Sequence, residues 1–303
     1  MKWIFFVLCT VGVATSYAQN YVDILHTEYT KTPQNSFENS NNTTNLEKLN
    51  VNLTTPIQLK NGNAFLTGVV YDRVRTTLFN NQVKENVSSY ILKLGMNIKH
   101  SEEWSSTYLL LPKIASNFGV ELRKEDIQIG AIALFKKKKS EYLTYKFGAY
   151  ANADRFGPFL VPLFGAYYQK NKLEMDIMVP SYANINYSVQ PKITLGVNWR
   201  ATVKSYNRQT PTPDGYKIAL SYLHHLSNEI AAHVGYEPVK GIIVRGMAGV
   251  AVGRSFRVYQ NSDKIDFGLS LFRFGDDRVP LNTDFTNGAF ARVELAYRYY
   301  LPK

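Results

Sequence analysis

Apolar and polar residues alternate strictly along residues 192–207, KITLGVNWRATVKSYN. Every second residue from Ile193 to Val203 is apolar, and the residues between them are polar, small or basic. A period of two places successive side chains on opposite faces of a β-strand. The sequence therefore predicts an all-β chain. The same period recurs along residues 88–99, 142–151, 264–272 and 289–303.

The length of these stretches favours a membrane barrel over a soluble sandwich. They run for roughly 10 to 16 residues, whereas soluble strands average about 5–6 and a strand that crosses a bilayer needs about 9–11. Tyr167, Tyr168 and Tyr206 lie near the ends of such stretches, where membrane barrels carry aromatic girdles. Arg200 and Arg298 place full charges in mid-strand on the polar face.

The connections between the candidate strands alternate in length. Short periplasmic turns and longer outer loops are typical of outer-membrane barrels. The expected fold is an antiparallel transmembrane β-barrel of about 14 strands, within a range of roughly 12–16. Residues 178–191 are either two short strands or one irregular segment inside the lumen. The short turns are expected at residues 60–63, 100–103, 137–141, 227–229 and 260–263.

The N-terminus, MKWIFFVLCTVGVATSYAQN, has the pattern of a secretory signal peptide. Lys2 precedes an apolar run, and Ser16-Tyr17-Ala18 fits a small-x-small cleavage site. A membrane-spanning helix would need about 20 apolar residues, more than this run offers. We expect residues 1–18 to be removed and residues 19–303 to form one barrel domain. Cys9 is the only cysteine, so the mature chain is expected to lack disulfides and thiolate sites.

The formal net charge of +11 raises the question of a nucleic-acid partner. The basic run at residues 136–139 lacks the interleaved aromatic residues that stack on bases, and it falls in a predicted short turn. Anionic lipid headgroups are the expected neighbours of this run. The histidines show no metal-ligand spacing, and no phosphate-binding loop is present. No nucleic acid, metal or cofactor is expected.

The basic residues on the polar strand faces are the candidate functional residues. Acidic residues on the same faces are fewer. A basic lumen would concentrate anions. The alternative is a narrow or plugged barrel whose charges pair across strands. The candidate lumen-lining residues are Arg73, Arg75, Lys93, Lys146, Arg200, Lys204, Lys217, Arg292 and Arg298.

A second candidate constellation lies in YLHHLSNE, residues 222–229. His225 and Ser227 share one strand face, as a base and a nucleophile require. The motif His225-x-Ser227-Asn228 resembles the arrangement found in outer-membrane lipid A deacylases. Glu237 is the one loosely placed carboxylate that could orient the histidine. The pair is expected at a periplasmic turn and facing the lumen, away from lipid, so no catalytic residue is predicted and the chain is not expected to be an enzyme.

The stretch PSYANINYSVQPKITLGVNW, residues 180–199, together with the N-terminal segment and the aromatic terminal strand, carries a resemblance. The chain resembles a family of outer-membrane β-barrel proteins of unassigned function from Gram-negative bacteria. The resemblance covers most of the mature chain. It implies a location in the bacterial outer membrane, with outer-membrane lipid and the barrel-insertion machinery as partners. It supplies no catalytic residues.

Three functions stay open at this point. The first is a passive channel or transporter for small polar solutes, including anions. The second is a non-conducting barrel that scaffolds or assembles envelope components. The third is a membrane-embedded lipid hydrolase. Occupancy of the lumen separates the first two.

Overall fold

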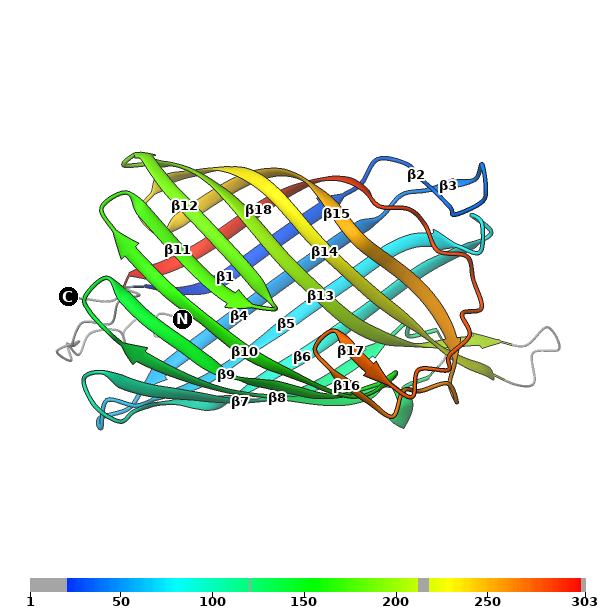
Figure 1. Ribbon diagram of the computed structural model, residues 1–303, viewed down its shortest axis with the longest axis horizontal. Helices are drawn as coiled ribbons and strands as arrows, with labels where there is room; N and C mark the ends of the chain where they lie inside the picture. The colour runs from blue at the N-terminus through cyan, green and yellow to red at the C-terminus, as the bar shows by residue number, and fades with distance from the viewer. Residues whose placement is uncertain (1–20, 120, 212–217, 301–303) are drawn as a thin grey trace, which may run out of the picture.

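The computed structural model describes residues 21–119, 121–211 and 218–300, so the predicted signal peptide lies outside the described residues. Fourteen of the described strands form one antiparallel sheet in which each barrel strand pairs with the next. The last barrel strand pairs back with the first, which closes the sheet into a barrel (Figure 1). The predicted all-β fold with 14 strands is confirmed. No helix among these residues is long and apolar enough to cross a membrane.

The barrel strands differ in length, and two of them are notably short. They are β1 (Tyr21–Lys31), β4 (Glu47–Gln58), β5 (Ala64–Leu78), β6 (Val83–Lys99), β7 (Trp104–Ser116), β8 (Ile127–Lys138), β9 (Leu143–Asp154), β10 (Gly157–Lys170), β11 (Leu173–Val179), β12 (Tyr182–Gln190), β13 (Ile193–Pro211), β14 (Ile218–Val239), β15 (Ile242–Gln260) and β18 (Gly288–Tyr300). The connections carry β2 (Asn35–Ser36), β3 (Thr43–Thr44), the 3₁₀ turn η1 (Lys124–Asp126), β16 (Phe267–Leu269) and β17 (Phe272–Phe274).

The two ends of the barrel differ in their connections (Figure 1). Tyr21 pairs with Tyr300, so β1 begins and β18 ends at the same end of the barrel. That end carries tight turns such as the one at Gly241, whose φ of +88° favours glycine. The opposite end, called the loop end below, carries the β2–β3 hairpin, η1 and the long connection from β15 to β18.

The sequence expectation was wrong at β14. Residues 227–229 were predicted as a short turn, yet they lie inside a strand of 22 residues. The pairing with β15 shifts register between Leu226 and Asn228, because β15 carries one extra residue there and forms a β-bulge opposite Ser227. Glu229, which resembled a turn residue, is buried and forms ion pairs inside the barrel.

Residues 264–272 were predicted as a barrel strand, and that prediction is also wrong. Two short strands, β16 and β17, form a hairpin there within the connection from β15 to β18. Ser270 has a φ of +52°, which reverses the chain in the middle of the alternating stretch. Residues 260–263 consequently begin a long connection and do not form a short turn. The open question at residues 178–191 is resolved as two short strands, β11 and β12.

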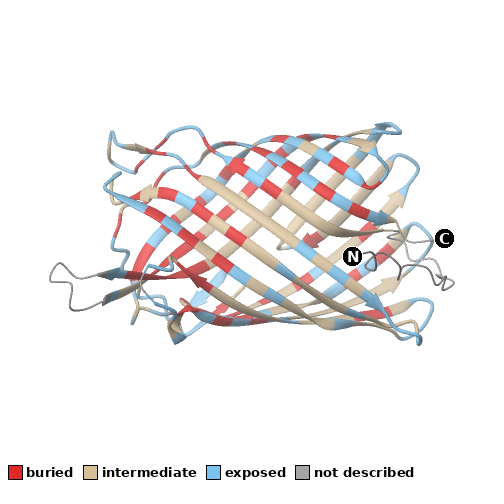
Figure 2. Ribbon diagram, turned by 180° about the vertical axis from the view of Figure 1, so that it is seen from behind, coloured by how far each residue is buried: buried red, intermediate tan, exposed pale blue. Residues whose placement is uncertain are grey.

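Buried and exposed residues alternate along many strands of the barrel wall (Figure 2), as expected when successive side chains point to opposite faces. In β13, Leu195 and Val197 are exposed on the outside of the barrel. The next residue, Asn198, is buried on the inside. Apolar side chains are exposed on the outside of strands all around the barrel. Examples are Leu53, Val69, Leu92, Leu110, Ile129, Phe147, Phe164, Val234, Val250 and Leu295.

Near the loop end, β13 and β14 turn inward and pass through the interior of the barrel. Residues 205–209 of β13 and 222–225 of β14 are buried on both faces, so the alternation is lost there. Asn207 pairs with Ser116 of β7, which is not a neighbour of β13 in the wall. The Tyr206 hydroxyl donates to Asp72 of β5, and Arg208 donates to Glu85 of β6. We call residues 205–209 and 222–225 the inward segment.

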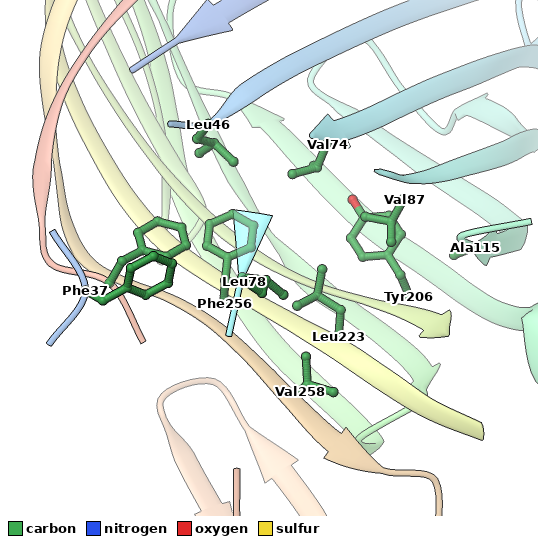
Figure 3. Packing of buried hydrophobic residues seen from close by; sticks show 11 residues of the cluster. Phe37, Leu46, Val74, Leu78, Val87, Ala115, Tyr206, Leu223, Phe256 and Val258 are labelled. Carbon is green, nitrogen blue, oxygen red and sulfur yellow. The ribbon is translucent and has the colours of Figure 1, made fainter. Parts of the chain in front are cut away.

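The inward segment packs against the opposite wall and closes the lumen at the loop end. Val74, Leu78 and Val87 of that wall meet Tyr206 and Leu223 of the inward segment (Figure 3). All are essentially shielded from solvent. Further members of this cluster come from the first long loop, β7, β15 and the last connection. They are Phe37, Leu46, Ala115, Phe256, Val258 and Phe285.

Candidate functional site: the barrel lumen

Below the inward segment, the interior of the barrel contains a cavity of about 290 Å³. Its wall is built by inward-facing residues of β1, β4 and β5 on one side and of β13 and β14 on the other. The charged lining consists of three carboxylates and three cationic side chains. These are Glu28, Asp72 and Glu229 with Lys48, Arg200 and Lys204; Asn50, Thr202 and His225 are also part of the lining.

The charges of the cavity are joined in ion pairs that cross the lumen. Arg200 Nη1 lies 2.6 Å and 2.8 Å from the two oxygens of Glu28. Lys204 Nζ lies 2.9 Å from Asp72. Glu229 pairs with both Lys48 and Arg292. None of these partners is adjacent in sequence. Three of the pairs, Glu28–Arg200, Asp72–Lys204 and Lys48–Glu229, join the first strands of the chain to β13 or β14, which the pairing of β18 with β1 brings together.

Two further candidates also have acidic partners. Lys146 Nζ lies 2.7 Å from Asp176, and Arg298 Nε lies 2.7 Å from Asp23. Lys93 differs, because its ammonium donates to the side chains of Asn52 and Thr54.

Arg73 and Arg75 were predicted to face the lumen, and the structure contradicts this. On β5 the residues with buried side chains are Asp72, Val74, Thr76 and Leu78, while Arg75 is exposed. Because the side-chain period of a strand is two, Arg73 and Arg75 must lie on the outer face. Lys217 lies outside the described residues.

This pairing changes what the lumen can do. A wall of unpaired basic residues would concentrate anions, whereas a wall of paired charges has little net potential. The pairs Glu28–Arg200, Asp72–Lys204 and Lys48–Glu229 also join strands that are distant in the sheet, so they hold opposite walls together. A buried charge that loses its partner is strongly destabilising, so these pairs stay formed. The paired side chains therefore narrow the lumen that they line.

The chain matches a family model described as a domain of unknown function (DUF6268) over residues 14–267. The match covers most of the barrel. The chain belongs to the DUF6268 family. No curated protein is similar enough to this chain to count as a match.

Solved structures that resemble this DUF6268 barrel are distant from it. A TodX deltaS2S3 mutant monoaromatic hydrocarbon channel has a TM-score of 0.38 and 9% identity, covering 91% of this chain and 89% of that chain. The beta domain of the Bordetella autotransporter BrkA has a TM-score of 0.31 and 11% identity, covering 92% and 100%. Acinetobacter baumannii OccAB4 has a TM-score of 0.26 and 9% identity, covering 91% and 97%. Likenesses this distant carry no functional argument, so the fold rests on the strand pairing itself.

The hydrolase constellation is not assembled in the DUF6268 barrel. Both ring nitrogens of His225 and the Ser227 hydroxyl are buried without a hydrogen-bond partner, so base and nucleophile do not bond to each other. The His225 ring instead stacks on Phe256, with 4.1 Å between the ring centroids. Glu237 lies near the other end of β14, where it accepts hydrogen bonds from Gly241 and Tyr300.

A group with possible metal ligands was missed by sequence reasoning. Atoms of His26, Glu28 and Glu294 lie within 4.8 Å of one another. Arg200 already holds Glu28, and Arg245 already holds Glu294. A divalent ion would have to displace these guanidinium groups, so the donor set is better explained as part of the ion-pair network.

The acidic halves of the network were largely missed as well. Glu28 and Glu229 looked like ordinary polar positions, because their partners come from strands far away in sequence. Around Asp72 both alternation frames of residues 69–75 contain apolar and charged residues, so the pattern cannot choose a frame.

Proposed function

We propose that this DUF6268 barrel spans the bacterial outer membrane and passively carries small polar solutes without net charge. The observation that carries the proposal is the 290 Å³ cavity inside the closed wall, whose three carboxylates are balanced by three cationic side chains. Pockets that hold drug-sized ligands have volumes of about 300–1,000 Å³. A cavity at the lower end of this range has room for a small solute.

The membrane part of the proposal is supported by the outer face. Soluble monomers rarely expose continuous apolar patches, yet here exposed aliphatic and aromatic side chains surround the barrel. The closed sheet leaves no free backbone edge over most of the wall, as a bilayer demands.

The substitution Val197→Arg tests the membrane placement. Val197 is 49% exposed on the outer face of β13. An arginine there should destabilise the folded protein in lipid vesicles by about 2–4 kcal/mol if the site lies near the bilayer midplane. Ile127→Arg is the control, because Ile127 is 56% exposed on the outer face at the loop end of β8, and it should cost at most about 1 kcal/mol. Equal costs for the two variants would contradict a bilayer around the middle of the barrel.

The solute part is supported by the charge balance. Since Glu28, Asp72 and Glu229 each have a cationic partner, the cavity attracts anions much less than a wall of unpaired basic residues would. The earlier expectation of anion preference is therefore replaced by weak selectivity. The inward segment closes the loop end, so passage requires this segment to move.

A matched pair of variants tests the balance. In planar bilayers under a salt gradient, the wild-type reversal potential should lie near zero. Arg200→Gln should shift the preference towards cations because Glu28 is left uncompensated. Glu28→Gln should shift it towards anions, and the double variant should return it towards zero. Shifts of the same sign in both single variants would rule out the cavity as the selectivity site.

The closed loop end also favours the scaffold function, and the same recordings separate the two. A folded, heat-modifiable barrel with no conductance and no swelling of vesicles in arabinose would reject transport. Envelope assembly would then be the better proposal.

A further inference from the structure

The barrel wall is interrupted between β10 and β13. These strands are joined by the short strands β11 and β12, which meet at residues 180–181 well before the loop end (Figure 1). Pairing of β10 with β11 begins only at Phe164, and pairing of β13 with β12 ends at Arg200. From these residues towards the loop end, no described barrel strand fills the space between β10 and β13.

The β16–β17 hairpin covers part of this gap. It joins β10 through two parallel residue pairs, Phe159–Gly268 and Leu160–Leu269, with a further bond from Ser270 N to Leu160 O of 2.8 Å. By contrast, β10 pairs with β9 along almost its whole length. The base of the hairpin is anchored by Ile265, which is buried and donates its N–H to Phe156 O at 2.8 Å. Beyond this anchor the cover has few backbone bonds, so residues 267–274 open at a smaller free-energy cost than a strand of the wall.

The outer side of the cover is apolar. Leu271 is 86% exposed and Phe272 is 67% exposed at the tip of the hairpin. The neighbouring wall is also apolar outside, since Ile129 is exposed and lies in the same ladder row as Ala153 and Pro158. Exposed aromatic and aliphatic groups of this size fit a lipid surrounding, so the cover faces the hydrocarbon of the membrane.

The inner side of the gap is apolar too. Phe159, Val161 and Leu163 of β10 point inward. They are buried in one cluster with Met178 of β11 and Tyr222 of the inward segment. This inner face continues over Leu134 and Tyr150 of β8 and β9. An apolar lining does not stabilise polar solutes, whereas it is the surrounding that a hydrocarbon chain favours over water.

The apolar lining and the polar cavity meet at one residue. Val203 of β13 packs against the apolar cluster and also lines the 290 Å³ cavity. The cavity accepts a polar group, and the cluster beside it accepts a chain. Together they have the two-part chemistry of an amphiphile.

We infer that the gap between β10 and β13 is a lateral entry for the acyl chain of a single-chain amphiphile with a small uncharged headgroup, and that the β16–β17 hairpin is its door. This inference rests on the proposed transport function, because the headgroup uses the cavity assigned there. The cluster is packed in this structure, so the chain enters when the hairpin moves off β10.

Photolabelling in vesicles tests the route. The probe is a monoacylglycerol with a diazirine in its acyl chain, added to phosphatidylcholine vesicles that hold the purified barrel. The alternation of β10 separates the two environments: Phe159, Val161 and Leu163 report on the inner face, while Phe164 reports on surrounding lipid. We expect labels on both sets. Labels on the outer set alone would overturn the inference.

A disulfide tests the door. Leu160→Cys with Leu269→Cys joins two residues that pair across β10 and β16. Cys9 is the only native cysteine and lies outside the described residues, so the pair has no competitor in the barrel. Oxidation should reduce inner labelling to background, and a reductant should restore it. The control is Ala133→Cys with Ala149→Cys, which pair across β8 and β9 and should leave inner labelling unchanged.

The outcomes separate this inference from the proposed function. Inner labelling that persists in the oxidised β10–β16 pair overturns the door. Arabinose swelling without inner labelling keeps the transport function and rejects the lateral entry. Inner labelling without swelling or conductance supports the entry and rejects passage of free polar solutes. If the double-cysteine variant does not insert, the label map of the unmodified protein still decides the route.

Discussion

Replacing Glu229 with alanine is expected to lower the free energy of unfolding by about 3–5 kcal/mol. Glu229 is 3% exposed and is the shared partner of Lys48 and Arg292, and the Arg292 side chain is equally well buried. The substitution leaves two cationic groups inside the barrel without their carboxylate. Urea unfolding in lipid vesicles measures the loss.

The control for this variant is Glu102→Ala. Glu102 also forms an ion pair, with Lys99, but its side chain is 71% exposed at a tight turn. Exposed pairs contribute about 0–1 kcal/mol, so this variant should unfold close to the wild type. A loss of similar size in both variants would show that the interior network has no special weight.

Replacing Phe256 with alanine is expected to cost about 3–5 kcal/mol and to loosen the closed end. Phe256 is fully buried between His225 and Phe285, with ring centroids 4.1 Å and 5.1 Å away. Loss of the ring leaves a void where the inward segment packs. The urea midpoint should fall, and swelling of vesicles in arabinose should become faster than with the wild type.

Val252→Ala on the outer face of β15 is the matched control. Val252 is 47% exposed, so its truncation leaves no void inside the barrel and should change neither the swelling rate nor the closure of the lumen. An unchanged swelling rate in Phe256→Ala, together with a lowered urea midpoint, would mean that packing at the loop end stabilises the barrel without gating it.

The architecture of the wall could be predicted from the sequence. A period of two held over long stretches specifies strands with one apolar face, and the length of these strands predicts a barrel wall of the height that a bilayer crossing requires. The prediction failed where local patterns mislead. Residues 227–229, where β15 bulges opposite Ser227, resemble a turn, and residues 264–272 alternate like a strand although Ser270 reverses the chain.

Only the basic residues of the candidate site could be predicted from the sequence. Arg200, Lys204 and Arg292 were found because basic residues stand out on a polar strand face. Their acidic partners were not, since a pair such as Glu28–Arg200 joins residues 172 positions apart. Arg73 and Arg75 were misplaced because both faces of β5 carry charges in this stretch, and a shift of one residue exchanges inside and outside.

Residue order alone specifies the wall: alternating strands, an apolar exterior and basic interior positions. How that interior is used depends on the tertiary structure. Closing the sheet brings distant strands face to face, so charges that look like an open basic pore become ion pairs. Closure also explains why β13 and β14 turn inward, since the contacts of β13 with β5, β6 and β7 exist only in the closed barrel. The physical reason is the same in each case: alternation encodes which face a side chain takes, whereas its partner across the lumen depends on the curvature and register of the whole barrel.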